Sequence, residues 1–252
     1  MLALPILALF LRVPGHSIFH RLADPAIHQA LILSLITSVA ATLIVVILGI
    51  PTAYLLATRQ FPGKRLLETL IDLPMVLPPT VAGLALLLAF GRAGLGGRAL
   101  HLLGIELPFS TLGVVVAQAF MSAPFFLNPA RAGFASVDRR YLEAATTLRA
   151  SEFYRFLHVM LPLAFPSLMA GATMAGARAL GEFGATITFA GNLPGVTQTM
   201  PLAVYVAMQS DMGAAITLSV LLVAIAVILL LVVKSSQPLQ TFWRFGAERD
   251  SE

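Results

Sequence analysis

Residues Tyr141 to Pro162 read YLEAATTLRASEFYRFLHVMLP and form a polar, helix-favouring stretch between long hydrophobic segments. The rest of the chain is nearly uncharged, because Asp, Glu, Lys and Arg make up only 11% of its 252 residues while 58% are hydrophobic. A polar helical stretch between hydrophobic spans is a place where a membrane protein meets something in the cytosol. The sequence therefore predicts that this stretch receives force from a cytosolic partner and passes it to the flanking spans.

The composition indicates an integral membrane protein. A soluble domain of this size carries about 25% charged residues, and the mean hydropathy of this chain is +0.88. The absence of cysteine excludes disulfides, cysteine-bound zinc and thiol chemistry. The pI near 10 does not indicate nucleic-acid binding, because the basic residues mark the loops.

Six segments are candidate membrane crossings, since about 20 apolar residues span the hydrocarbon core. They cover approximately residues 2–13, 29–57, 70–90, 110–132, 163–190 and 212–233. Their apolar runs are continuous rather than alternating, which favours helices over barrel strands. We therefore expect an all-α, polytopic fold with about six transmembrane helices in a single domain, 1–252. The first helix is short; it is not read as a signal peptide, because no basic residue precedes it and no convincing cleavage site follows.

Three prolines interrupt the third span, at positions 74, 78 and 79. Proline removes a backbone donor and breaks a helix. A broken membrane helix is tolerated where it faces protein or a wet cavity rather than lipid. The alternative is a kink that serves packing only.

The basic residues are distributed unevenly over the loops. Eleven lie in the loop at 59–65, in or beside the polar region and in the tail 234–252, whereas four lie on the other side. The positive-inside rule therefore puts the polar region and the tail in the cytoplasm, and with six spans the N-terminus as well. We expect a multi-pass protein of the cytoplasmic (inner) membrane with both termini cytoplasmic.

Capping residues predict two short helices in the polar region. Ser136 and Asp138 can open the first helix and Ser151 the second, because their side-chain oxygens accept free backbone N–H groups. The small residues Ala144 and Ala145 let another surface approach closely, and such a helix suits docking into a groove on a partner. The alternative is a surface helix that merely packs on the bundle.

The same stretch resembles the EAA loop of permeases of bacterial ABC importers, which reads Glu-Ala-Ala, then Gly, then an aliphatic residue and Leu-Pro at fixed distances. This chain has Glu143-Ala144-Ala145, Val159 and Leu161-Pro162 at those distances, and Arg149 at the glycine position. Glycine there would allow a left-handed helix end, so Arg149 leaves the form of the bend open. The resemblance implies a coupling loop, about 134–162, that meets a separate ATPase through Glu143, Ala144, Ala145, Leu148, Arg149, Leu161 and Pro162.

The resemblance extends from about residue 24 to residue 233 and is closest to the molybdate/tungstate permeases, the ModB kind. Residues 73–81, LPMVLPPTV, and 177–186, ARALGEFGAT, are similar to their third-span and fifth-span signatures. It implies a type I ABC importer permease fold and import of molybdate or tungstate. Sulfate/thiosulfate permeases share much of the fifth-span signature and remain the alternative. The short first span departs from the family, in which that helix is complete and clasps the other subunit.

The resemblance also implies the assembly: a homodimer with a second copy of the permease, two cytoplasmic ATPase subunits, an extracytoplasmic oxyanion-binding protein and membrane lipid, without nucleic acid. ATP and magnesium would belong to the ATPase, and this chain would hold no cofactor, no metal and no catalytic residue. The residues agree on one point. Gly63-Lys64 is followed by Arg65 and lacks the upstream glycine of a phosphate-binding loop, so another chain must hydrolyse ATP.

Arg178 and Glu182 lie four residues apart on one face of the fifth span. An isolated charge at the bilayer centre costs at least about 2.5 to 3.5 kcal/mol, so the two are either a structural pair or border the pathway or its gate. A glutamate lining an anion path would repel the cargo, and we do not expect Glu182 to bind it. The residues expected at the pathway or its gate are Pro78, Pro79, Thr80, Arg178, Glu182, Thr186 and Thr188.

Two other function classes fit the sequence less well. An intramembrane hydrolase needs a serine beside a histidine and an oxyanion hole, but the histidines lie near loops or membrane edges and no Gly-x-Ser-x-Gly occurs. An ion-coupled secondary carrier would take up its cargo without ATP. No long-range internal repeat is visible, which argues against carriers built from inverted repeats in one chain.

Overall fold

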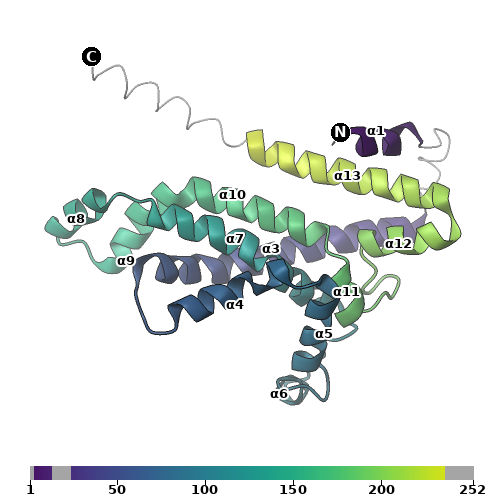
Figure 1. The fold of residues 1–252 in the computed structure, drawn as a ribbon, viewed down its shortest axis with the longest axis horizontal. Coiled ribbons are helices and arrows are strands. Elements are labelled where there is room, and N and C mark those ends of the chain that lie inside the picture. Colours follow the sequence, from purple (N-terminus) through teal and green to yellow (C-terminus); the bar gives the residue numbers. More distant parts are fainter. Residues whose placement is uncertain (1–2, 13–23, 236–252) are drawn as a thin grey trace.

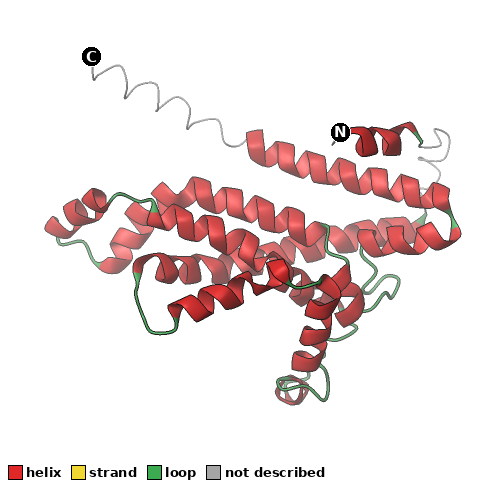
Figure 2. Cartoon of the chain, in the orientation of Figure 1, coloured by secondary structure: helices red, strands yellow, loops and turns green. Residues whose placement is uncertain are grey.

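The computed structural model describes residues 3–12 and 24–235, and the regular elements in these ranges are all helices, as Figure 2 shows. The all-α expectation is confirmed. The expected linker before the second span falls mostly on residues 13–23, and most of the expected tail falls on 236–252, so both lie outside the described residues.

Within the described residues, four helical runs are long and apolar enough to cross a membrane. They are α3 (Pro25–Thr58), α7 (Thr111–Ala135), α13 (Met212–Ser235), and the run of α9 (Glu152–Arg155), the π-helical segment η1 (Phe156–Met160) and α10 (Leu161–Leu180). These long helices lie along the longest axis of the molecule (Figure 1). The fourth, fifth and sixth spans were expected to begin within about two residues of the starts of α7, α10 and α13. The second span was expected at residue 29, four residues after the observed start of α3.

The other two expected crossings are not single long helices. The third is divided into α4 (Lys64–Val76) and α5 (Pro79–Phe90), and the first is the nine-residue α1 (Ala3–Leu11). The expected proline break is confirmed, but it lies at Leu77 and Pro78, which are extended, whereas Pro74 stays inside α4. The residue before a proline is pushed out of the helical region, and here two successive prolines act on Leu77 and Pro78.

Short helices gather at the end of the bundle opposite to α8 (Arg139–Thr147) and α9. The fifth span was expected to reach residue 190, but α10 ends at Leu180 and α11 (Gly184–Phe189) follows after a break. Next comes α12 (Met200–Ser210), a helix that the sequence reasoning did not assign. Figure 1 shows α11 and α12 at this end, while α5 and α6 (Gly97–Leu102) extend away from the long bundle.

The main core lies between α3, α7 and α10. Phe126 of α7 is fully buried, and it fits because glycines face it on both sides. A Cβ at Gly49 of α3 would lie 2.5 Å from Phe126 Cδ1, and one at Gly171 of α10 would lie 3.0 Å from the Phe126 carbonyl oxygen. This close packing fixes the ends of α7 and α10, and the chain between those two ends is the polar loop.

A second close contact joins α5 to α11. A Cβ at Gly83 would lie 2.7 Å from the Ala185 carbonyl oxygen, and one at Gly184 would lie 2.6 Å from Pro79 Cβ. The second half of the broken third span, α5, is therefore packed backbone to backbone on the segment that follows α10. Small residues permit such an approach between membrane helices.

Candidate functional site

The polar loop forms the two short helices expected from its capping residues. Asp138 accepts a hydrogen bond from the Arg140 N–H at 2.9 Å and begins α8, and Ser151 accepts one from the Tyr154 N–H at 3.2 Å and begins α9. Ser136 is the exception. It caps the end of α7, where its hydroxyl donates to the Gly133 carbonyl at 2.8 Å.

The bend after α8 has the left-handed form even though an arginine occupies it. Arg149 has φ 59°, a conformation that non-glycine residues rarely adopt. The Ala150 N–H bonds to the Ala145 carbonyl at 3.0 Å and the Arg149 N–H to the Thr146 carbonyl at 2.9 Å. This pair of bonds is the Schellman motif that usually carries glycine. The bend therefore forms with arginine at this position, and the left-handed conformation of Arg149 is strained.

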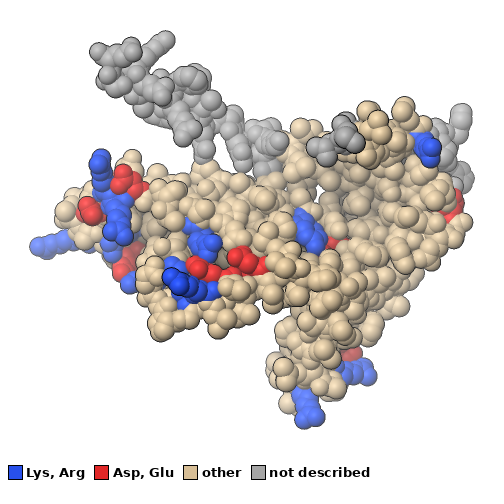
Figure 3. All heavy atoms as spheres, viewed as in Figure 1, with Lys and Arg blue, Asp and Glu red and all other residues tan. Residues whose placement is uncertain are grey.

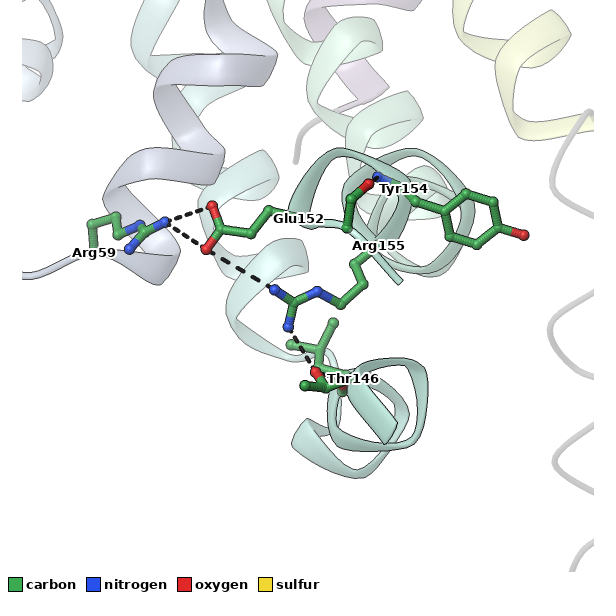
Figure 4. Close-up of polar contacts among 7 residues, drawn as sticks. Arg59, Thr146, Glu152, Tyr154 and Arg155 are labelled. Atoms are coloured by element: carbon green, nitrogen blue, oxygen red, sulfur yellow. Dashed lines mark hydrogen bonds and ion pairs between the residues drawn. The ribbon is translucent and has the colours of Figure 1, made fainter. Parts of the chain in front are cut away.

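A polar network ties α8 and α9 to the end of α3, as Figure 4 shows. Arg59 Nη2 lies 3.0 Å from Glu152 Oε2, Arg155 Nη2 lies 4.0 Å from Glu152 Oε1, and Arg155 Nη1 donates to Thr146 Oγ1 at 2.8 Å. The sequence reasoning missed this network, because Arg59 lies 93 residues from Glu152 and only the folded chain brings them together.

Near this network an aromatic cluster joins α3 to α7 and η1. Tyr54 of α3 packs edge-on against Phe134 of α7, with ring centroids 5.9 Å apart, and against Phe156 of η1 at 4.8 Å. Leu142 of α8 packs against the same core. The inner side of α8 is therefore held through Leu142 and the polar network, while the rest of the helix is free to contact another molecule.

The expected coupling residues are available at the surface. No residue of α8 is buried; Glu143 and Ala144 are exposed, Ala145 is half-buried, and the Leu148 side chain is 83% exposed. Leu161 and Pro162 do not join this patch, since they begin α10 beyond η1. Figure 3 shows blue and red atoms gathered over α8 and α9, on a molecule that is mostly tan.

The π-helical segment η1 connects this surface to α10. The Leu161 N–H bonds to the Phe156 carbonyl, five residues back instead of four. Such π segments are rare and often lie at functional sites. No sequence signal predicted this one.

The two charges expected inside the fifth span form an ion pair. Arg178 Nη2 lies 2.6 Å from Glu182 Oε2, and Glu182 Oε1 accepts the Ala185 N–H at 2.7 Å. The Glu182 side chain is 1% exposed and that of Arg178 is 25% exposed. Thr186 is buried with no partner for its hydroxyl in the described residues.

The pathway residues expected from the third span lie beside those of the fifth. Gly184 lies against Pro79 and the Thr80 backbone, and Pro78, Pro79 and Thr80 are exposed. The Thr188 hydroxyl donates to the Gly184 carbonyl at 2.9 Å. The structure therefore brings Pro79 and Thr80 beside α11, which carries Thr186 and Thr188, whereas Arg178 lies in α10.

A second polar contact joins α4 to α7 and was not expected. Arg131 Nη1 lies 2.9 Å from Glu68 Oε1, and Asn128 Nδ2 donates to Asp72 Oδ1 at 2.8 Å. Only Pro74 of α4 is buried, so these half-buried pairs contribute to the attachment of α4 beside the packing of Ile71 on the core. The sequence reasoning had counted Arg131 among the basic residues beside the polar region.

In the described ranges, no group of three or more His, Asp or Glu side chains could hold a metal ion. The site is thus an exposed helical patch at one end of the bundle and an ion pair within it.

Comparison with known proteins identifies relatives over nearly the whole chain. Residues 46–239 match the family model described as binding-protein-dependent transport system inner membrane component. The chain is 42% identical over 239 residues to the molybdenum transport system permease protein ModB of Mycobacterium tuberculosis, covering 95% of this chain and 90% of the relative. It is 43% identical over 214 residues to ModB of Escherichia coli, covering 84% and 93%.

More distant relatives extend the comparison. The molybdate/tungstate transport system permease protein WtpB of Thermococcus kodakarensis is 39% identical over 191 residues, covering 75% of this chain and 72% of the relative. Among solved structures, a chain of a bacterial ABC transporter that imports alginate matches with a TM-score of 0.77 at 14% identity, covering 94% of this chain and 89% of that one. This match supports the fold alone.

Proposed function

We propose a cargo and a set of partners for this chain, which belongs to the family of binding-protein-dependent transport system inner membrane components. It is a permease subunit of an ABC importer, a multi-pass membrane transport component and not an enzyme. The cargo that we propose is molybdate or tungstate. Identity of 42% along 95% of the chain to a molybdenum permease is the observation that carries this proposal.

The partners follow from the polar end of the bundle. We propose that α8 docks into a cytoplasmic ATPase, which binds ATP and magnesium. The helix supports this role because its outer side is uncovered while its inner side is held by Leu142 and by the network of Arg59, Glu152 and Arg155. A displacement of α8 would therefore reach α3 and η1 together.

The complete assembly would contain two copies of this permease, two ATPase subunits and an extracytoplasmic oxyanion-binding protein. Both chain termini would lie in the cytoplasm, on the side of α8, as the distribution of basic residues indicates. One domain, 1–252, would include the coupling loop at about 134–162 and a cytoplasmic tail, 234–252.

Uptake of labelled anions tests the cargo. In cells that lack their own molybdate permease, the complete transporter containing this chain should restore ATP-dependent uptake of molybdate and tungstate. Uptake of sulfate alone would refute the choice of cargo and favour the sulfate/thiosulfate alternative. Uptake driven by an ion gradient without ATP would instead indicate a secondary carrier.

A single charge on α8 tests the docking. Leu148→Asp puts a carboxylate on an exposed residue, so the fold should not change, and copurification of the ATPase with the permease should fall at least tenfold. Leu95→Asp is the matched control, because Leu95 is a 99% exposed leucine in the loop after α5. Full ATPase recovery with Leu148→Asp would show that α8 is not the docking helix.

A further inference from the structure

The ion pair within the fifth span is unequally buried. Glu182 Oε1 accepts the Ala185 N–H, whereas Oε2 lies at ion-pair distance from Arg178 Nη2 without an aligned hydrogen bond. The Arg178 guanidinium has five N–H donors, and among the described residues Glu182 is the partner recorded for it. A quarter of this side chain is exposed and none of its nitrogens is a buried atom without a partner, so Arg178 has donors that Glu182 does not occupy.

The position of Arg178 makes contact between these donors and lipid unfavourable. Arg178 lies 17 residues after Leu161, which is about 25 Å along a helix and within the approximately 30 Å of the hydrocarbon core. Arginine inside a membrane span almost always faces the bundle interior or a water-filled cavity. We therefore expect the exposed part of the Arg178 side chain to face a cavity rather than lipid.

A purely structural pair would explain only part of this arrangement. A cation in the last turn of α10 favours the helix dipole, and the pair neutralises the buried Glu182 carboxylate. Neither role needs donors at the surface. The planar fork of arginine matches the oxygens of a tetrahedral oxyanion in two-point contacts.

We propose that Arg178 binds the tetrahedral oxyanion in transit through the guanidinium donors that Glu182 leaves free. This inference rests on the proposed function, which supplies an anionic cargo. Glu182 is a positioning residue that acts through its charge: the carboxylate offsets the positive charge that the anion meets. The contact is therefore weak, and a weak contact suits a pathway that must release the anion.

Neutralising both members separates this proposal from a structural role. Arg178→Gln/Glu182→Gln removes the cation without leaving a buried carboxylate unpaired, and two amides retain a hydrogen bond. In proteoliposomes with ATPase and loaded binding protein, molybdate transported per ATP should fall about tenfold, a loss typical of one charge-assisted contact, while ATP hydrolysis stays within twofold. An unchanged ratio would overturn the proposal.

A second variant keeps the test decisive if the double variant does not assemble. Glu182→Gln retains Arg178 at full charge, so the detergent-solubilised complex should bind labelled molybdate about tenfold more tightly than the unmodified complex. Equal or weaker binding would overturn the proposal. Glu68→Gln/Arg131→Gln is the control, because it neutralises the other half-buried pair and should leave molybdate per ATP unchanged.

An error in the proposed cargo can be distinguished from an error in the proposed role of Arg178. If the unmodified complex carries sulfate and not molybdate, the cargo is wrong, but the same variants can be measured with sulfate, which is also a tetrahedral dianion. Only the difference between variants and unmodified complex reports on Arg178.

Discussion

Replacing Arg149 by glycine should stabilise the bend that ends α8. Arg149 holds a left-handed conformation, φ 59°, which costs an L-residue roughly 1–2 kcal/mol and costs glycine nothing. Glycine offsets roughly 0.5–1 kcal/mol of this gain in stability, because it loses more backbone conformational entropy than alanine when the chain becomes ordered. Arg149→Ala removes the same charge and keeps the Cβ, so the comparison of Arg149→Gly with Arg149→Ala isolates the backbone term. The glycine variant should be more stable locally by about 1 kcal/mol, or about fivefold in the opening equilibrium.

Hydrogen–deuterium exchange in the intact transporter measures this difference. The Ala150 N–H is protected by its bond to the Ala145 carbonyl, so its exchange reports opening of the bend. After correction for intrinsic rates, this amide should exchange about fivefold more slowly in Arg149→Gly than in Arg149→Ala. Arg149→Lys keeps both the charge and the Cβ and should match the unmodified chain. Equal exchange in the glycine and alanine variants would refute the strained, left-handed bend.

Two further predictions concern stability, each measured as the thermal unfolding midpoint of the solubilised transporter. Gly83→Ala should destabilise the contact between α5 and α11 by roughly 1–3 kcal/mol through overpacking, because its Cβ would lie 2.7 Å from the Ala185 carbonyl oxygen. Gly181→Ala is the control and should be tolerated, because its Cβ would lie 3.6 Å from the nearest atom. Equal unfolding midpoints for the two variants would contradict the close packing at Gly83. Arg131→Gln should lower the free energy of unfolding by about 2 kcal/mol, between the values for exposed and buried pairs, because it leaves Glu68 unpaired. The double variant Glu68→Gln/Arg131→Gln should recover most of this loss of stability. No recovery would mean that the pair does not help to hold α4.

Local signals predicted the elements whose cause is local. Continuous apolar runs located the four long helices, and Asp138 and Ser151 located the starts of α8 and α9. The proline pair at 78 and 79 located the break in the third span, because its effect on the backbone depends only on neighbouring residues. Pro74 misled, since a proline inside a helix is tolerated when the freed carbonyl finds other contacts.

Contacts between distant segments could not be read from the sequence. Arg59 was counted as a loop cation and Arg131 as one beside the polar region, yet each pairs with a carboxylate on another helix. The helix α12 was also missed, because turn residues precede it and the apolar run after them is short. The Arg178 and Glu182 pair was expected on one helix face, but α10 ends at Leu180, so Glu182 pairs with Arg178 from the break before α11. Their unequal burial depends on neighbouring helices.

The π-helical segment Phe156–Met160 has a mechanical consequence for the chain between α8 and α10. Its turn contains one residue more than an α-helical turn, as the Leu161 to Phe156 bond shows. Rewinding that turn into α-helix would rotate everything before it by about 100° around the axis of α10, the angle that one residue subtends. The helix can therefore take up this additional residue without breaking its continuity. A push on α8 can therefore be taken up as a rotation of the fifth span together with a shift of about 1.5 Å along its axis.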